Sequence, residues 1–447
     1  MGAYRPLLSK LRGGAALFPL AAILLSACAG GGVTLRKKVD AKLAAGDYAG
    51  AQALVEGAKT GVYGYKNRVL YHLDLGAIEH DAGKYKASDD DFSVAEGDMD
   101  QLYTKSLHQA AGMLLLNDNT MDYAGERFER ALVNVYRALN YLFMDDRENA
   151  LVEIRKLSRL LQEYSDTSGG SIAYKDDAFG QYLSALLYAD GGQPDDARIA
   201  FEAAGRAYDS YATAYGTPRP PLDSAPLGDM NGELVFIHAN GTAPLKQSKT
   251  FQVAWGEGLA AVNSSGGEPN SAQARNAIRA GVVGHAITVA YPVYVQEPFR
   301  IRSSEIEVDG VKSGTRLVED VSAIAQKALA QRQALIRTRA VARAAIKYIL
   351  SQQVVIQAKR QYGEHSWQAF AAQAGTAALA AGTETADTRA WSTLPAQFLM
   401  TRMPLPPGEH QVTVRYRGAG NEVLLTRNFT VTIRKGQRAY LHDRTAL

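Results

Sequence analysis

The chain has 447 residues, about three times the length of a typical single domain, so we expect two or three folded units. Hydrophobic residues make up 46% and charged residues 21%, which excludes wholesale disorder and suffices for a sizeable core. Basic residues outnumber acidic residues by 49 to 46, but three of the basic residues lie in an N-terminal segment that we expect to be removed. The remaining balance of 46 to 46 argues against nucleic acid or another polyanion as a partner.

Residues 1–27 have the pattern of a bacterial secretory signal peptide. A basic start precedes the apolar run 15–25, which at 11 residues is too short to span a bilayer. The tetrapeptide Leu25-Ser26-Ala27-Cys28 resembles a lipobox, and the only cysteine of the chain is its last residue. The resemblance to bacterial lipoproteins implies that Cys28 carries acyl chains, such as palmitate, and anchors the mature protein permanently. Since residue 29 is not the Asp that retains lipoproteins at the inner membrane, we expect a lipid anchor on the periplasmic face of the outer membrane.

Residues 28–32 are predicted to form a short Gly-rich tether after the lipidated cysteine. A handful of extended residues reaches only about 15–20 Å. The first folded unit is therefore expected to lie close to the membrane.

A helical domain is predicted over residues 33–216, because amphipathic helical patterns follow one another there and no proline occurs before Pro194. A pattern of three residues recurs four times. A small residue is followed after four positions by a large apolar residue, and after three more positions by a small or apolar one. The four copies are Ala51/Val55/Ala58, Ser88/Phe92/Ala95, Ala150/Ile154/Leu157 and Ala197/Phe201/Ala204. This frame resembles the tetratricopeptide repeat and implies helical hairpins stacked into a solenoid. The unequal intervals of 37, 62 and 47 residues indicate a degenerate array with extra helices in the middle.

A Pro-rich linker is expected at 217–228, where four of the fifteen prolines occur. After it, residues 229–447 are predicted to form a β-rich, sandwich-like domain with a helical insertion at about 318–385. The expected strands are 234–238, 250–255, 285–295, 305–309, 397–401, 410–416 and 423–434, the last two joined by a hairpin turn at 418–421. A long helical pattern covers 318–359, and the Ala-rich stretch 369–381 favours a tightly packed helix. The predicted fold class is thus α+β.

Two charged clusters are candidates for function. Glu126, Glu129 and Arg130 have the spacing of one helical face, where two carboxylates could share a proton or hold a metal ion. An exposed face with an intrahelical ion pair explains them equally well. The second cluster is a group of cations at 332–347, which fits anionic lipid headgroups or an acidic partner, or else a solvated or internally paired helix face.

Motifs of cofactor, nucleotide and metal sites are absent from the sequence. The eight histidines show neither HExxH nor His-x-His spacing, so we expect no preformed zinc site and no cofactor. GxSxG, P-loop and strand-linked GxGxxG motifs do not occur. Together these observations favour a protein that is not an enzyme.

Three stretches, 123–142, 317–325 and 386–396 with its continuation 405–410, resemble a large, poorly characterised family of bacterial tetratricopeptide-like envelope lipoproteins. No enzymatic activity is established for that family, so the resemblance implies the anchor and the architecture. In the third stretch Asp387 and Arg389 flank a turn ahead of Trp391. Their charge pair could lock the helical insertion onto the following strand, or Trp391 could form the floor of a ligand pocket.

The leading functional hypothesis is a non-enzymatic protein–protein interaction scaffold of the cell envelope, anchored at Cys28 and offering a concave helical groove to an envelope protein. The alternative is an envelope hydrolase that acts on peptidoglycan or polysaccharide through Glu126 and Glu129. A glycosidase requires two carboxylates that face each other across a cleft at about 5–9.5 Å. Geometry therefore discriminates between the two hypotheses.

Overall fold

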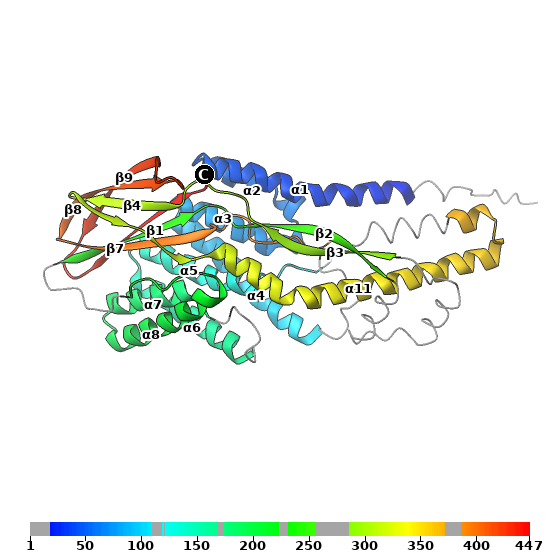
Figure 1. Cartoon of the computed structure of the whole chain (residues 1–447), viewed down its shortest axis with the longest axis horizontal. Helices are drawn as coiled ribbons and strands as arrows, with labels where there is room; N and C mark the ends of the chain where they lie inside the picture. The colour runs from blue at the N-terminus through cyan, green and yellow to red at the C-terminus, as the bar shows by residue number, and fades with distance from the viewer. Residues whose placement is uncertain are drawn as a thin grey trace, which may run out of the picture.

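The computed structural model describes residues 18–109, 119, 121–167, 174, 176–222, 231–254, 286–371 and 386–447. Helices dominate the first half of the chain and strands the second, which confirms the expected α+β class (Figure 1). The helices of the first half are α1 (Phe18–Ala44), α2 (Tyr48–Gly57), α3 (Arg68–Asp81), α4 (Tyr85–Gln109), α5 (Arg127–Phe143), α6 (Arg147–Thr167), α7 (Ala178–Asp190) and α8 (Pro194–Ala214), with short π and 3₁₀ turns at Lys59–Tyr63 and Tyr65–Asn67.

These helices form four hairpins, α1–α2, α3–α4, α5–α6 and α7–α8. The second helix of each of the first three hairpins packs on the first helix of the next one. All four hairpins have a three-residue loop whose middle residue has positive φ: Gly46, Gly83, Asp145 and Gly192. In every loop the middle N–H and the next N–H donate to carbonyls three and five residues back, which is the Schellman arrangement. The recurring sequence frame therefore corresponds to a recurring loop.

The small residue of each repeat lies five positions after the positive-φ residue, and all four small residues are buried: Ala51, Ser88, Ala150 and Ala197. A small side chain here lets the two helices of a hairpin approach closely. At the α3–α4 contact, a Cβ added to Gly76 would lie 2.9 Å from the Phe92 ring, so only glycine fits. Extra helices were expected in the long interval between Ser88 and Ala150. Residues 110–118 and 120 of this interval lie outside the described part.

The strands are β1 (Gly232–Asn240), β2 (Leu245–Ala254), β3 (Ala286–Val295), β4 (Ser303–Val308), β5 (Val311–Gly314), β6 (Arg316–Glu319), β7 (Gln397–Leu405), β8 (Gly408–Arg417), β9 (Val423–Ile433) and β10 (Arg438–Thr445). They form two four-stranded sheets, β10-β1-β7-β6 and β5-β4-β8-β9, and the ribbon β2-β3. All the described pairs are antiparallel except β1 with β10, which is parallel. Each of the seven expected strand regions contains a strand, and β5, β6 and β10 were not expected.

The two four-stranded sheets pack face to face, and the first of them also packs on the helices. Leu234 and Phe236 of β1 belong to the core between the sheets, together with Val412 and Val414 of β8. Residues 235, 237 and 239 of the same strand belong to the core shared with the helices. Every residue of β1 is buried, because this strand lies in the middle of three layers.

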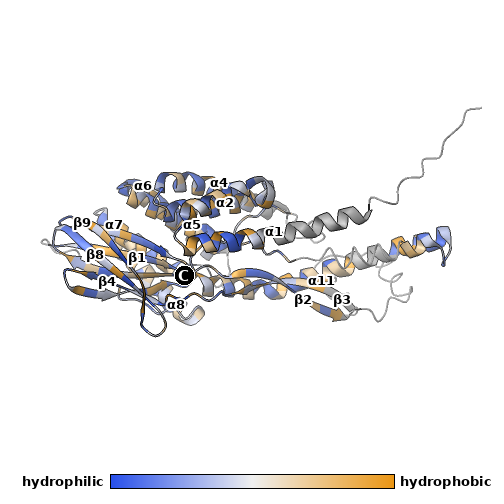
Figure 2. Ribbon diagram, turned by 90° about the horizontal axis from the view of Figure 1, so that it is seen from above, coloured by the Kyte–Doolittle hydropathy of each residue, from blue (hydrophilic) through white to orange (hydrophobic). Residues whose placement is uncertain are grey.

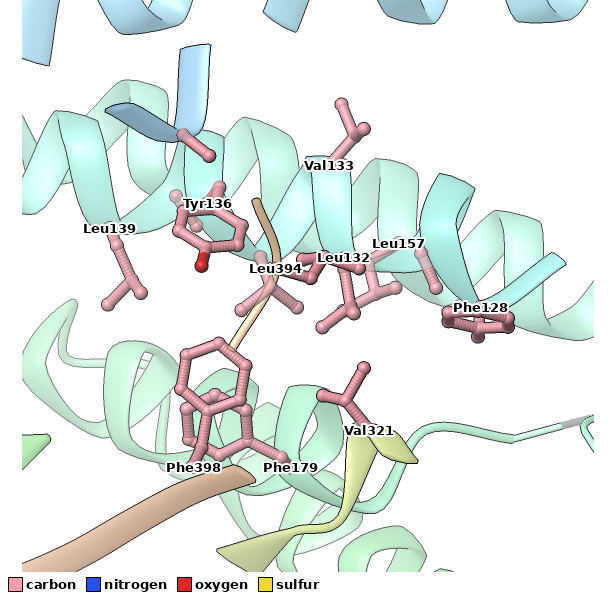
Figure 3. Packing of buried hydrophobic residues seen from close by; sticks show 14 of the residues in the cluster. Phe128, Leu132, Val133, Tyr136, Leu139, Leu157, Phe179, Val321, Leu394 and Phe398 are labelled. Atoms are coloured by element: carbon pink, nitrogen blue, oxygen red, sulfur yellow. The ribbon is translucent and has the colours of Figure 1, made fainter. Parts of the chain in front are cut away.

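The expected helical region 33–216 and the expected β-rich region 229–447 both contribute residues to this shared core. Figure 3 shows Phe179 of α7 and Phe398 of β7 side by side in it, and their rings stack with centroids 5.2 Å apart. In the linker, residues 217–222 lack regular secondary structure, as the prolines predict, but they pack on the helices: Thr217 is buried, and Tyr182 Oη donates to the Pro221 carbonyl. Residues 223–228 lie outside the described part.

A long helix and the β2-β3 ribbon form an extension that we call the arm. The helix is α11 (Val321–Tyr362), a single helix of 42 residues, or about 60 Å, that packs along β3. The helix predicted at 318–359 is therefore found. Its first two predicted residues, 318 and 319, belong instead to the end of β6. The arm and α1 project to the same side of the molecule in both views (Figures 1 and 2). Residues 367–371 are helical, and the rest of the Ala-rich stretch lies outside the described part.

The helix α1 includes residues 28–32, for which the sequence suggested a tether. Residues 1–17, the first part of the expected signal peptide, and the side chain of Cys28 lie outside the described part. Among the helices that the structure describes, none combines the length and the apolar character that crossing a membrane requires.

Candidate functional site: the polar junction between helices and sheet

The three stretches that carry the family resemblance meet at one place, where the helices contact the first sheet. The N-terminal end of α5 contacts the segment 386–394, which we call the strap, and the start of α11 is hydrogen-bonded to the end of the third stretch. Trp391 N donates to Glu129 Oε1 at 2.8 Å, and Ser322 N donates to the Ala396 carbonyl at 3.1 Å. Figure 3 shows Val321 and Leu394 facing the α5 side chains across this junction.

Glu129 is buried and accepts three hydrogen bonds. Its Oε2 accepts from Tyr123 Oη at 2.5 Å and from the Glu126 backbone N–H at 2.8 Å, and its Oε1 accepts from Trp391. Burial and the neighbouring Glu126 charge raise the pKa of Glu129 to about 7. Hydrogen bonds to the charged form oppose this rise without cancelling it.

Glu126 is the anion of a three-element ion cluster. Its carboxylate is bound by Lys246 Nζ of β2 at 3.2 Å and by Arg332 of α11. Although burial opposes ionisation, these two cations hold the pKa of Glu126 below its ordinary value. Glu126 therefore ties the arm to the start of α5.

Arg130, the third residue of the predicted helical face, does not join the two glutamates. Its guanidinium pairs with Asp100 Oδ1 of α4 at 2.7 Å and lies over the Tyr103 ring. The structure thus brings Glu126 and Glu129 to the strap and directs Arg130 to the neighbouring helix.

Asp387 and Arg389 form a two-point ion pair inside the strap, with Nε–Oδ1 and Nη2–Oδ2 distances of 2.9 and 2.8 Å. Arg389 also donates to the Met121 carbonyl at 2.7 Å and to Asn67 Oδ1 at 3.2 Å. Burial opposes ionisation of Asp387, but the hydrogen bonds and charge of Arg389 hold its pKa below the ordinary value. The pair locks the strap onto the helical half, rather than the helical insertion onto the following strand as the sequence suggested.

Trp391 fills a hydrophobic core and is not the floor of an open pocket. Only 1% of its surface is exposed, and its ring packs against Phe92 and Tyr136. Beside Trp391 and Glu129 lies a cavity of about 10 Å³, room for one water molecule and far too small for a sugar.

The residue that sequence reasoning missed is Asp74 of α3. Its buried carboxylate accepts five hydrogen bonds at 2.7–3.2 Å: from the Tyr63 hydroxyl, from the backbone N–H and hydroxyl of Ser392, and from the same two groups of Thr393. No motif marks Asp74, since all but one of its donors lie more than 300 residues away. With Glu129, it binds the strap to α3 and α5, so this helical face is occupied by the chain itself. The expected groove open to a protein partner is therefore not found on this face.

The arrangement does not suit glycoside hydrolysis at Glu126 and Glu129. Both carboxylates are largely withdrawn from solvent and bound to donors of the protein, and they come from one end of α5 instead of facing each other across a cleft. The described geometry gives these two residues a structural task, which is to hold the strap and the arm.

The cations expected at 332–347 are partly used inside the protein. Arg332 binds Glu126, Arg337 lies over the rings of Phe251 and Tyr291, and Arg343 is buried, whereas Arg339 is exposed. Over its whole length, however, α11 has eight basic residues and no acidic residue.

One group within the described residues could hold a metal ion, although the sequence gave no metal motif. It consists of His80 and Asp81 at the end of α3 and His442 on β10. The two histidines are 362 positions apart, so no local spacing could have indicated the group.

The raised pKa of Glu129 predicts a distinctive pH dependence of stability. Between its pKa of 4.5 in the unfolded chain and about 7 in the folded protein, the folded state keeps a proton that the unfolded state releases. Stability should therefore fall as pH rises through this window, by roughly 3 kcal/mol at 1.36 kcal/mol per pKa unit. In Glu129→Gln this contribution disappears, so its free energy of unfolding relative to wild type should increase between pH 4.5 and 7.5. Urea unfolding at both pH values measures this, and parallel pH profiles would contradict the assignment.

Comparison of the chain with models of known protein families, with curated proteins and with solved structures gives no match.

Proposed function

We propose that the chain is an outer-membrane lipoprotein, anchored through Cys28, that acts as a non-enzymatic protein–protein interaction scaffold in the periplasm. The N-terminal pattern and the resemblance to tetratricopeptide-like envelope lipoproteins support the anchor. The four hairpins with one loop conformation and buried small residues support a degenerate tetratricopeptide-like solenoid. The structural use of Glu126 and Glu129 favours a scaffold over a hydrolase.

The observation that carries the proposal is the arm. Its helix α11 has eight basic residues and no acidic residue. The last residue of α11, Tyr362, is 50% exposed, and Trp367 and Phe370 just beyond it are 68% and 74% exposed. Exposed aromatic rings beside Lys and Arg suit the headgroup region of a membrane that contains anionic lipids. In Figure 1 the arm projects to the same side as α1, the helix that contains Cys28, so anchor and arm would contact one membrane surface.

The contact of the arm with lipid is tested in cells by a photo-cross-linking amino acid at position 367 or 370. We expect adducts to phospholipid at both positions. The control position is Val423 at the start of β9, which is also exposed but belongs to the second sheet and not to the arm. Protein adducts in place of lipid at 367 and 370 would assign the arm to a protein partner, and equal lipid labelling at 423 would contradict the orientation.

The scaffold role is tested with the same cross-linker on the helical half, at the exposed residues Tyr65 and Ile199. Cross-linking at single positions is preferable to deletion of residues 33–214. The two halves share a hydrophobic core, so the deletion would leave the remaining half without part of its core. A scaffold predicts one defined envelope protein in adducts from at least one position. No protein adduct from either position would count against it.

The anchor has a direct prediction of its own. Cys28→Ser should abolish acyl-chain labelling and leave a chain that is either released as soluble protein or retained with its signal peptide. The fold should persist, because among the described side chains the buried residues of the hydrophobic clusters begin at Val39. Cell fractionation and labelling with palmitate compare mutant and parent. Parent protein in the soluble fraction, or label that persists in the serine variant, would contradict lipidation at Cys28.

A further inference from the structure

Three residues that could ligate a metal ion come together between α3 and β10. One nitrogen of His80, one nitrogen of His442 and one carboxylate oxygen of Asp81 lie within 4.8 Å of one another. Each of the three residues also has a buried atom without a hydrogen-bond partner: His80 Nε2, His442 Nε2 and Asp81 Oδ1. Buried polar atoms are nearly always satisfied in folded proteins, so three unpartnered atoms on neighbouring ligand residues point to a missing common partner.

A hydrogen-bond chain fixes which nitrogen of His80 is available. Asn140 Nδ2 donates to Ser88 Oγ at 2.9 Å, and Ser88 Oγ donates to the Gly76 carbonyl at 2.7 Å. The Asn140 carbonyl oxygen therefore faces His80 Nδ1, 2.6 Å away, and must accept its proton. The lone pair is then on Nε2, on the side of His442 and Asp81. A histidine that donates one N–H to a fixed carbonyl and turns the other nitrogen to a shared centre is typical of metal ligands.

The kinds of ligand atom in the cluster also suit a metal ion: two imidazole nitrogens and one carboxylate oxygen. Arg444 lies 3.4 Å from Asp81 Oδ2 and contributes an opposing positive charge, but it leaves Oδ1 without a partner. The hard ions Ca²⁺ and Mg²⁺ prefer oxygen-rich sites. A site with two imidazole nitrogens next to the Arg444 guanidinium disfavours them and favours a transition metal.

We propose that His80, Asp81 and His442 bind one divalent transition-metal ion, for which zinc is the best match, and that this ion fastens α3 to β10. Zinc bonds of about 2.0–2.2 Å place tetrahedral ligand atoms roughly 3.4 Å apart, so the three ligands need to close by about 1 Å. The ion would link the helical half to the C-terminal strand and leave one coordination position for water.

The test uses the purified full chain, first as isolated and then after removal of metal with a chelator. We expect about one equivalent of zinc per chain by elemental analysis, and visible d–d absorption of a tetrahedral site when Co²⁺ replaces it. Adding Zn²⁺ to the metal-free protein should raise Tm by about 3–5 °C. Substoichiometric zinc together with the absence of Co²⁺ bands and of any Tm shift in the wild-type chain would overturn the proposal.

Variants assign the ligands. His442→Gln and Asp81→Asn should each weaken Zn²⁺ binding at least about 100-fold. The matched control is His410→Gln, because His410 is a buried histidine of the same half, held by Asp309 and the Pro406 carbonyl. Loss of binding in the control, or unchanged affinity in both ligand variants, would place the metal elsewhere and refute this site. The measurements on the wild-type chain decide whether a metal ion binds, so the proposal stays testable even if a variant fails to fold.

Discussion

Asp74→Ala is expected to lower the free energy of unfolding by roughly 3–5 kcal/mol, one of the largest effects of any single substitution in the chain. The carboxylate is buried and accepts hydrogen bonds from the Tyr63 hydroxyl and from both backbone N–H groups of Ser392 and Thr393. Alanine leaves these donors without an acceptor in a site that water does not reach. Because the strap is held by Asp74 and Glu129 together, its release should also loosen the packing of Trp391.

The measurement is urea unfolding followed by tryptophan fluorescence and circular dichroism. The control is Asp90→Ala on α4, since Asp90 is 65% exposed and pairs only with Lys86 one turn away. Such exposed pairs contribute between 0 and about 1 kcal/mol. A loss in Asp74→Ala no larger than that of the control would show that the strap does not depend on this carboxylate.

Arg438→Leu is the second substitution with a large expected effect, again roughly 3–5 kcal/mol. Arg438 of β10 is 3% exposed and lies between two buried carboxylates, Asp190 at 2.6 Å and Glu233 at 2.7 Å. Tyr440 and Arg402 complete the cluster by binding Asp190 and Glu233, respectively. Leucine replaces the volume but leaves Asp190 without its ion-pair partner, in a site that joins α7 to three strands of the first sheet.

The cost should depend on pH, which separates the charge from simple packing. Burial already raises the pKa of Asp190, and Arg438 is the main charge that opposes this rise. Without Arg438 the pKa of Asp190 rises further, so the folded variant retains the Asp190 proton to higher pH than the wild type. Its stability relative to the wild type should therefore fall as pH increases from 4.5 to 7.5. The exposed Arg198→Leu, which breaks a surface pair with Glu202, should cost less than about 1 kcal/mol at both pH values. An equal cost of Arg438→Leu at the two pH values would indicate lost packing instead of an uncompensated charge.

These clusters explain why the helices and the sheet are one folded unit. Asp74, Glu129 and Asp190 come from the helical half, and their donors come from the strap and from β10. Each cluster contains carboxylates that are costly to bury, so each is stable only when both halves are in place. A polar junction of this kind holds the strap, the arm and β10 against the helices.

The candidate site was only partly predictable. The spacing of Glu126 and Glu129 and the turn at Asp387 and Arg389 were found in the sequence, because charged residues at regular intervals stand out in a local pattern. The contact between these two segments was not found in the sequence, since Trp391 and Glu129, which form a hydrogen bond, are 262 positions apart in the chain. Nor does a helix pattern show that a distant segment of the same chain, the strap, covers the face formed by α3 and α5.

The sequence by itself determined the local structure: the four hairpins, seven of the strands, the long helix of the arm and the turn at 418–421. Amphipathic periods, Gly at a positive φ and prolines act over fewer than about ten residues, so they can be recognised without a fold. Only the tertiary structure decided that β10 pairs with β1 in parallel, that the halves share one core, and that His80, Asp81 and His442 meet. These outcomes depend on burial and on contacts between residues hundreds of positions apart, which no local pattern encodes.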